Sequence, residues 1–393
     1  MSASDHSSRP LRCGAAPEES AFYRELVARH GSPLLVVSRA ALRRQYRDLT
    51  RHLPGVALYY AIKAFPHPAV VEILAGLGCH FDVASEGELA LLRDLKISGR
   101  KTIHTHPVKK VDQIKAALRG GSTTFVVDNL DELKKLTPWR HRVGVLLRVS
   151  FRSPGAAVDL SRKFGCLPEQ AEALVLEGQR LGFQVRGLSF HVGSQNLDPG
   201  AQVAAIEACG RLIEAIDQKA PTPLGTLDIG GGFPVDYAWQ GFDFEAYFQP
   251  IRTALAALPE DLHLIAEPGR YLVAPAVRGV ATVIGKARRG DRLWYYLDDG
   301  IYGSYSGQLF DHARYPLQVL AEGPRTAAVL AGPTCDSIDV IAEDLTLPPL
   351  EEGDLVIGHL MGAYTAATST RFNSLEAAQV VVVERFPDES SPG

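Results

Sequence analysis

Between residues 56 and 266, short apolar runs alternate with segments whose apolar residues recur at helical spacing. The runs lie at Val56–Ile62, Cys79–Val83, Thr102–His104, Thr124–Val127, Gly144–Val149, Gly187–His191, Leu227–Ile229 and Leu264–Ala266. Strands that alternate with helices in this way favour a parallel sheet. Eight units over about 220 residues predict an α/β fold with a closed (β/α)8, TIM-like barrel, and an open doubly wound sheet is the alternative.

The pattern changes after Arg270, where strand-like runs are separated by Gly, Pro and charged turns and show little helical periodicity. These runs are Val280–Val283, Arg292–Leu297, Leu317–Leu320, Thr326–Leu330, Asp354–Ile357 and Ala378–Val383. They predict a C-terminal, mostly antiparallel β domain, which the N-terminal segment joins. We expect the barrel over residues 34–272, a discontinuous β domain over 21–33 and 273–386, a disordered tail over 1–20 and a second tail over 387–393.

Composition narrows the classes of partner. A chain of 393 residues that is 46% hydrophobic can bury the cores of two domains. The net charge of -4 gives no reason to expect nucleic acid or a membrane surface, so a small molecule is the expected partner. Five scattered cysteines without a CxxC pair or zinc-site spacing predict no metal and a reducing cytoplasm, and no apolar segment reaches about 20 residues.

Lys63 is a lone lysine in the aromatic, apolar stretch Tyr59–Phe65. Burial disfavours the charged form of a lysine, so we expect its pKa to fall towards neutrality and its amine to become a nucleophile for a carbonyl. Lys63 is therefore a candidate Schiff-base former. The alternative is a strand-end lysine whose ammonium reaches out to water.

Polar residues stand at the ends of other predicted strands, where the active sites of such barrels lie. They are Asp82 after the second strand, Arg148 on the fifth, His191 and Ser194 after the sixth, and Glu267, Gly269 and Arg270 after the eighth. Singly, His191 could be a satisfied core histidine and Glu267 a structural ion-pair partner. Jointly, they surround one predicted barrel mouth.

Three successive glycines, Gly230, Gly231 and Gly232, follow the seventh strand and expose backbone N–H groups that suit a phosphate, although a flexible turn would look the same. A phosphorylated aldehyde cofactor would use the whole set. Lys63 would form the aldimine, and the glycines with Arg270 would hold the phosphate. Glu267 would pair with a protonated ring nitrogen, and His191 would lie flat on the ring.

Seven motifs resemble the fold type III pyridoxal-phosphate decarboxylases, the ornithine and diaminopimelate decarboxylase family. They are Tyr-Ala-Ile-Lys ending at Lys63, Phe-Asp-Val-Ala-Ser at 81–85, His-Val-Gly-Ser at 191–194, Gly-Gly-Gly-Phe-Pro at 230–234, Glu-Pro-Gly-Arg at 267–270, Gly-Pro-Thr-Cys-Asp at 332–336 and Gly-Ala-Tyr-Thr at 362–365. The resemblance extends from about residue 34 to residue 386. It implies a decarboxylase with pyridoxal 5'-phosphate as its cofactor.

The resemblance also implies roles for individual residues. Lys63, His191 and Glu267 keep the roles given above, and Ser194, Gly230 to Gly232, Gly269, Arg270 and Tyr364 would hold the phosphate, while Asp82 and Arg148 orient groups around the lysine and ring. The family works as a head-to-tail homodimer, so Cys335 and Asp336 would enter the site from the partner subunit. Cys335 would help to protonate the carbanion left when CO2 departs.

The substrate is expected to be a basic amino acid, L-ornithine first and L-lysine second. By resemblance to the ornithine branch, Asp311 and Asp336 would meet the side-chain ammonium and Phe372 would orient the substrate chain, although both aspartates could be solvated loop residues. Diaminopimelate stays open as a substrate, as does a larger amine such as a siderophore or carboxypolyamine intermediate. A racemase on the same barrel and a non-enzymatic regulatory relative are competing hypotheses for the function.

Overall fold

The computed structural model of this protein describes residues 9–151 and 162–389. It divides into two compact units. The barrel unit comprises residues 46–234 and 243–272, and the sheet unit comprises the described residues up to 45 together with 235–242 and 273–389. None of the described helices is long and apolar enough to cross a membrane.

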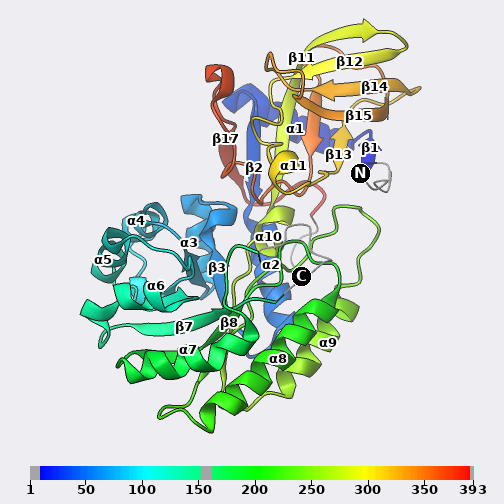
Figure 1. The fold of residues 1–393 in the computed structure, drawn as a ribbon. Helices are drawn as coiled ribbons and strands as arrows, with labels where there is room; N and C mark the ends of the chain where they lie inside the picture. The colour runs from blue at the N-terminus through cyan, green and yellow to red at the C-terminus, as the bar shows by residue number, and fades with distance from the viewer. Residues whose placement is uncertain (1–8, 152–161, 390–393) are drawn as a thin grey trace. The chain divides into compact units, whose positions relative to one another are not determined.

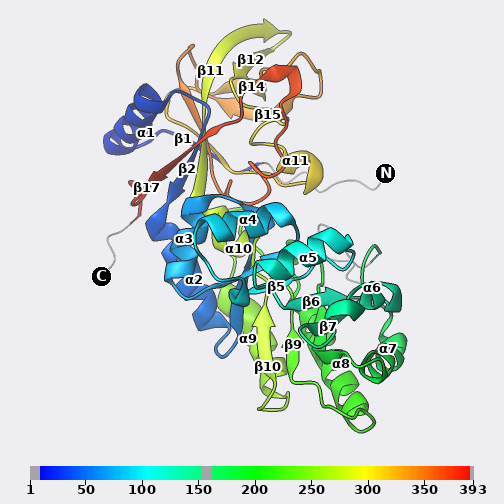
Figure 2. The same cartoon turned by 90° about the vertical axis from the view of Figure 1, so that its left-hand side faces the viewer.

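Eight parallel strands close the barrel (Figures 1 and 2). They are β3 (Ala57–Ala61), β4 (His80–Val83), β5 (Thr102–His104), β6 (Thr124–Val127), β7 (Gly144–Val149), β8 (Gln184–Phe190), β9 (Thr226–Asp228) and β10 (His263–Ala266). Because β10 pairs with β3 as well as with β9, the sheet has no free edge, and the open-sheet alternative is wrong. The predicted barrel is thus confirmed, with each predicted run on one strand.

Helices follow the strands and cover the outside of the barrel (Figure 2). They are α3 (Pro68–Gly76), α4 (Glu86–Asp94), α5 (Val111–Arg119), α6 (Leu130–Lys135), α7 (Pro168–Arg180), α8 (Pro199–Asp217) and α9 (Phe244–Ala256), with α2 (Arg39–His52) and α10 (Arg270–Val273) where the chain passes from one unit to the other. Local sequence explains where several begin. Ser85 caps α4 by accepting a hydrogen bond from the Glu88 N–H, and Asn129 caps α6 in the same way.

Apolar side chains fill the interior of the barrel. Ile103, Val126, Leu146 and Ile265 form one buried cluster, to which β5, β6, β7 and β10 contribute one residue each. A packed interior of branched side chains is what makes such a barrel a core and not a pore. Chemistry is therefore confined to the strand ends and the loops that follow them.

The sheet unit contains a nine-stranded, mostly antiparallel sheet, as predicted. Its strands are β1 (Leu11–Cys13), β2 (Leu34–Ser38), β11 (Val277–Arg289), β12 (Arg292–Leu297), β13 (Leu317–Val319), β14 (Thr326–Ala331), β15 (Val340–Leu347), β16 (Leu355–Gly358) and β17 (Gln379–Val383), and its helices are α1 (Pro17–His30) and α11 (Gly307–Phe310). Strand β2, within the range expected for the barrel domain, pairs with β11 and β17 in this sheet.

Strand β15 was not predicted. The pair Glu343 and Asp344 interrupts its apolar pattern, and both side chains are exposed. In the path of strands, β15 stands at one end and pairs with β14. Charged side chains are common on edge strands because they discourage pairing with another chain. Here they break the apolar pattern from which a strand would be predicted.

Candidate active site

Lys63 and Asp82 form an ion pair at the mouth of the barrel. Lys63 lies in the short turn Ile62–Ala64 that follows β3, and Asp82 lies on the neighbouring strand β4. The Nζ of Lys63 donates a hydrogen bond of 3.0 Å to Oδ2 of Asp82. Asp82 is only 1% exposed, and its other oxygen, Oδ1, accepts a hydrogen bond from the hydroxyl of Thr105.

The expectation that Lys63 is buried is wrong. Its side chain is 43% exposed, because β3 ends at Ala61 and the following turn carries the amine out of the apolar run. Desolvation is therefore no explanation for a reactive amine at this position. What holds the amine is its ion pair with the buried carboxylate of Asp82.

His191 follows β8 and is electrically neutral near pH 7. Its Nδ1 accepts a hydrogen bond of 3.0 Å from the N–H of Gly193, so the neutral ring carries its proton on Nε2. Burial lowers the pKa of His191 well below its ordinary value, and the nearby cations of Arg148 and Lys63 lower it further. A neutral imidazole can lie against an aromatic ring without adding charge to it.

Two buried carboxyl groups, Glu267 and Asp228, lie close enough at the ends of β10 and β9 for each to influence the pKa of the other. Their side chains are 8% and 0% exposed. Burial raises the pKa of Glu267 well above its ordinary value, and the carboxylates of Asp228 and Asp82 add to that rise. A nearby cation would stabilise the ionised form of this carboxyl group, and a protonated ring nitrogen is such a cation.

Asp228 was not among the predicted site residues. Its Oδ1 accepts a hydrogen bond of 2.9 Å from the N–H of Gly230, so it holds the start of the glycine run, and its charge raises the pKa of Glu267. A polar residue at the end of a strand is the sequence signal that could have found Asp228, as it found Asp82.

The glycine run passes close to two other site residues. A Cβ atom on Gly231 would lie 2.4 Å from the carbonyl oxygen of Glu267 and 3.4 Å from Nε2 of His191. The carbonyl of Gly230 accepts a hydrogen bond of 2.7 Å from the N–H of Glu267. At Gly231 the backbone therefore approaches the neighbouring loop so closely that only glycine fits.

Arg270 and Ser194 add a cation and a hydroxyl next to these loops. Arg270, which follows Gly269 and begins α10, is 5% exposed and donates a hydrogen bond of 3.0 Å from Nη2 to Oγ of Ser194. A guanidinium, a hydroxyl and backbone N–H groups are the donors that bind phosphate in proteins. Arg148 lies on β7 with its guanidinium carbon 5.5 Å from the centre of the Phe164 ring. The barrel mouth thus fits a phosphorylated aromatic cofactor.

The sheet unit brings together a second group, built around Asp336. The hydroxyl of Tyr302 donates a hydrogen bond of 2.5 Å to Oδ2 of Asp336, and this bond lowers the pKa of Asp336. The ring of Phe372 stacks on that of Tyr302, with 4.6 Å between their centres and an angle of 26°. Cys335 is exposed, and its N–H donates a hydrogen bond of 3.1 Å to Oδ1 of Asn373. Sequence reasoning had missed Tyr302.

Asp311 and Tyr364 lie elsewhere in the sheet unit. Asp311 directly follows α11 and is half-buried, and its N–H donates to the carbonyl of Gly307. Tyr364 follows β16 with a φ of 56°, and its carbonyl accepts a hydrogen bond of 2.6 Å from the hydroxyl of Thr368. The roles expected for Asp311 and Tyr364 stay predictions.

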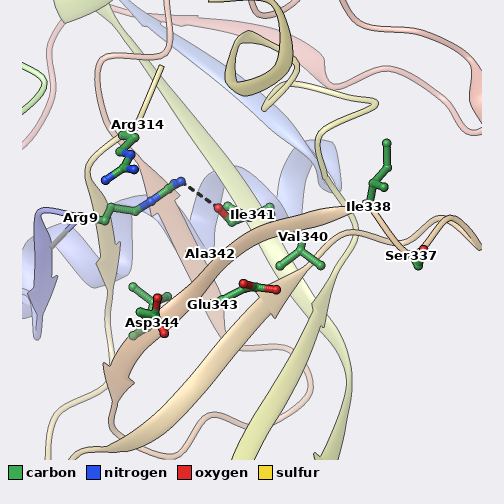
Figure 3. A pocket seen from close by; sticks show the side chains of 10 residues that line it. Arg9, Arg314, Ser337, Ile338, Val340, Ile341, Ala342, Glu343 and Asp344 are labelled. Atoms are coloured by element: carbon green, nitrogen blue, oxygen red, sulfur yellow. Dashed lines mark hydrogen bonds between the residues drawn. The ribbon is translucent and has the colours of Figure 1, made fainter. Parts of the chain in front are cut away.

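The sheet unit also has a cavity of about 570 Å³ that none of the predicted site residues lines (Figure 3). Arg9 and Arg314 lie on one side of it, and Glu343 and Asp344 of β15 on another. Nη2 of Arg9 donates a hydrogen bond of 2.8 Å to the carbonyl of Ile341, which ties the N-terminal segment to β15. The charges of both signs in its lining select no particular class of ligand.

Comparison with known proteins agrees with this geometry. The family model of the pyridoxal binding domain of pyridoxal-dependent decarboxylases matches residues 39–274. The chain is 39% identical over 364 residues to the lysine/ornithine decarboxylase of Selenomonas ruminantium, and the match covers 92% of each chain. It is also 35% identical over 357 residues to antizyme inhibitor 2 of Xenopus laevis, covering 86% of this chain and 78% of that one.

A solved structure extends the likeness to the whole fold. The crystal structure of lysine/ornithine decarboxylase from Vibrio vulnificus complexed with cadaverine superposes with a TM-score of 0.89 at 47% identity, covering 93% of this chain and 97% of that one. The chain therefore belongs to the fold type III pyridoxal-dependent decarboxylases, in the branch that resembles ornithine decarboxylase, and is an amino-acid decarboxylase with pyridoxal 5'-phosphate as its cofactor.

Proposed function

We propose that the chain decarboxylates L-ornithine to putrescine and L-lysine to cadaverine. The observation that carries this choice of substrates is the carboxylate of Asp336, whose pKa is lowered by the Tyr302 hydroxyl and which lies next to the exposed thiol of Cys335. An ionised carboxylate favours a substrate whose far end is a cation. The names of the two lysine/ornithine decarboxylases above support the same pair of substrates.

In this proposal, residues of the barrel mouth hold the cofactor. Lys63 attaches its aldehyde, and Asp82 and Arg148 orient groups around the lysine and the ring. Glu267 pairs with the ring nitrogen, with Asp228 behind it, and His191 lies against the ring as a neutral imidazole. The phosphate is held by Ser194, the backbone of Gly230, Gly231 and Gly232, Gly269 and Arg270, and by Tyr364 of the sheet unit. Their hydrogen bonds, burial and charges, described above, support these roles.

The bound cofactor supplies an electron sink for the pair of electrons left when the substrate carboxylate departs as CO2. The protein's own contributions are binding and proton transfer. Asp336 and Asp311 bind the distal ammonium of the substrate, and Phe372 orients its carbon chain. The thiol of Cys335 then donates a proton to the carbon that has lost CO2, which yields the amine.

The active form in this proposal is a head-to-tail homodimer in which Cys335 and Asp336 of one copy serve the barrel of the other. The exposure of Cys335, Phe372 and the neighbouring Ile338 and Leu375 supports such an arrangement, because a group of exposed apolar side chains marks a site of interaction with another protein. A cytoplasmic location is supported by the five cysteines, which are all free thiols.

Different substrates compete with this pair. A larger amine-bearing carboxylate, such as a siderophore or carboxypolyamine intermediate, would also place a cation near Asp336. Diaminopimelate fits less well, because its second carboxylate would face that of Asp336. The family also includes antizyme inhibitor 2, to which the chain is similar. Lys63, the glycine run and Cys335 are the residues that an enzyme of this family needs, and this chain has them all.

The test is CO2 release by the purified, cofactor-loaded protein with L-ornithine, L-lysine, L-arginine and meso-diaminopimelate in parallel. We expect turnover of ornithine and lysine, and their ratio of kcat/KM ranks the two. Turnover of meso-diaminopimelate alone would refute the proposed role of Asp336. Silence with all four substrates, in a protein that still binds the cofactor, would refute the proposed substrates and direct the search to larger amines.

A further inference from the structure

Thr105 is a buried threonine just beyond the end of β5, and none of the roles above uses it. It is 5% exposed, and its hydroxyl donates a hydrogen bond to Oδ1 of Asp82. The other oxygen of the same carboxylate, Oδ2, accepts the hydrogen bond from Nζ of Lys63. Thr105, Asp82 and Lys63 thus form a chain of contacts in which each of the two carboxylate oxygens has one partner.

The two contacts together fix the plane of the Asp82 carboxylate. The terminal torsion of an aspartate is broad, so a carboxylate with one partner can turn about its own axis. A threonine hydroxyl is a stiff anchor, because β-branching restricts its side chain to few rotamers. The Thr105 bond therefore determines where Oδ2 points, and with it where the ammonium of Lys63 rests.

The loop that carries Thr105 is itself firmly attached. The N–H of Thr105 donates to the carbonyl of Val83, which continues the pairing of β4 with β5 by one residue. Further along the loop, the buried amine of Lys109 donates to the carbonyls of His106, Pro107 and Val126. These bonds join the loop to β4 and β6, so the Thr105 hydroxyl sits on rigid backbone.

Neighbouring carboxyl groups make the Thr105 hydrogen bond important for the position of Asp82. Asp228 and Glu267 are buried close enough to Asp82 for its charge to raise the pKa of both. Repulsion between the carboxylates of Asp228 and Asp82 would push an unanchored Asp82 away from its place. A donor on the side away from Lys63 offsets that repulsion.

We propose that Thr105 is a positioning residue, which holds Asp82 so that its carboxylate orients the amine of Lys63 for attachment of the cofactor. The inference rests on the proposed role of Lys63. It adds a residue whose hydroxyl bonds to Asp82, so its proposed effect on Lys63 is transmitted through that carboxylate.

The test measures the pH dependence of the reactivity of the Lys63 amine in the cofactor-free, full-length protein. Reductive methylation with formaldehyde and cyanoborohydride, followed peptide by peptide in a mass spectrometer, gives the rate of modification of Lys63 as a function of pH. An ion pair favours the protonated amine, which does not react. If Asp82 loses the Thr105 hydrogen bond and its ion pair with Lys63 weakens, the midpoint of this pH profile therefore moves to lower pH.

Three variants separate positioning from packing. Thr105→Val keeps the shape and removes the donor, and we expect its midpoint to fall by roughly half a pH unit or more. Thr105→Ser keeps the donor and should restore the wild-type midpoint. Thr102→Val is the matched control, because Thr102 is buried on β5, the strand that Thr105 follows, but its hydroxyl donates to the carbonyl of Gly99. This variant should leave the midpoint of the Lys63 pH profile unchanged.

Other titratable neighbours of Lys63 are the same in all these proteins. Among the described residues they include Glu88 on α4, His106 after β5, His191 after β8 and Glu267 after β10. An unchanged midpoint in Thr105→Val would overturn the inference, as would a shift of equal size in Thr105→Ser or Thr102→Val. If Thr105→Val does not fold, Thr105→Ala is compared with Thr105→Ser in its place.

The experiment also distinguishes failure of this inference from failure of the proposed function. Loading the wild-type protein with pyridoxal phosphate, reducing it with borohydride and mapping the labelled peptide tests Lys63 as the cofactor lysine. A label on another lysine would refute that role. The midpoints of the cofactor-free variants would still decide whether Thr105 positions Asp82.

Discussion

Replacing Gly231 by alanine tests whether the glycine run must lack a Cβ atom at this position. The added Cβ would lie 2.4 Å from the carbonyl oxygen of Glu267, closer than carbon and oxygen normally approach. Neither neighbour can give way easily, because the N–H of Glu267 donates to the carbonyl of Gly230 at 2.7 Å and so ties the two backbones together. The φ of Gly231 is not positive, so backbone strain plays no part.

The magnitude follows from the cost of overpacking. Extra carbon forced into a close-packed site costs about 1–3 kcal/mol. If the loops move apart to relieve the contact, the predicted phosphate donors move with them and most of this cost appears as lost cofactor affinity. Since about 1.4 kcal/mol corresponds to a factor of ten, the dissociation constant of pyridoxal phosphate should rise roughly 5- to 150-fold.

The assay is a titration of the cofactor-free protein with pyridoxal phosphate, followed by absorbance, together with urea unfolding of each protein. Gly225→Ala is the matched control, because Gly225 precedes the opposite end of β9 and a Cβ there would meet nothing within 4 Å. A Gly231→Ala protein that binds the cofactor within twofold of wild type would refute the reasoning. So would an equal loss of affinity in Gly225→Ala.

Three further predictions concern other charged groups of the two units. Lys63→Ala should abolish the visible absorbance of lysine-bound cofactor, and a full band in this variant would mean that another lysine holds it. Asp311→Ala and Asp336→Asn should each lower kcat/KM for ornithine and lysine while leaving the dissociation constant of pyridoxal phosphate unchanged, so unchanged kinetics would remove that aspartate from the pocket. Because the pKa of Glu267 is raised by burial, the folded cofactor-free protein keeps a proton that the unfolded chain loses above pH 4.5, and its stability should fall as pH rises from that point. Urea unfolding at several pH values should show a shallower fall in Glu267→Gln, and an identical slope would contradict the cause assigned to the shift.

Sequence alone was enough to predict the barrel and to select most residues of its mouth. The alternation of apolar runs and helical segments is a local pattern, and the C-terminal ends of parallel strands in a closed barrel meet at one mouth. Lys63, Asp82, His191 and Glu267 could therefore be grouped without coordinates. The charged edge strand β15 escaped the same reasoning, because Glu343 and Asp344 break its apolar pattern.

Tertiary structure alone decided the electrostatic state of these groups. Exposure of Lys63 depends on where β3 ends, which the apolar sequence around the lysine cannot reveal. The raised pKa of Glu267 depends on burial and on the charge of Asp228, which is far from it in the sequence. The Thr105 bond to Asp82 likewise joins adjacent strands. Desolvation and hydrogen bonding depend on neighbours in space, and local sequence patterns carry little information about them.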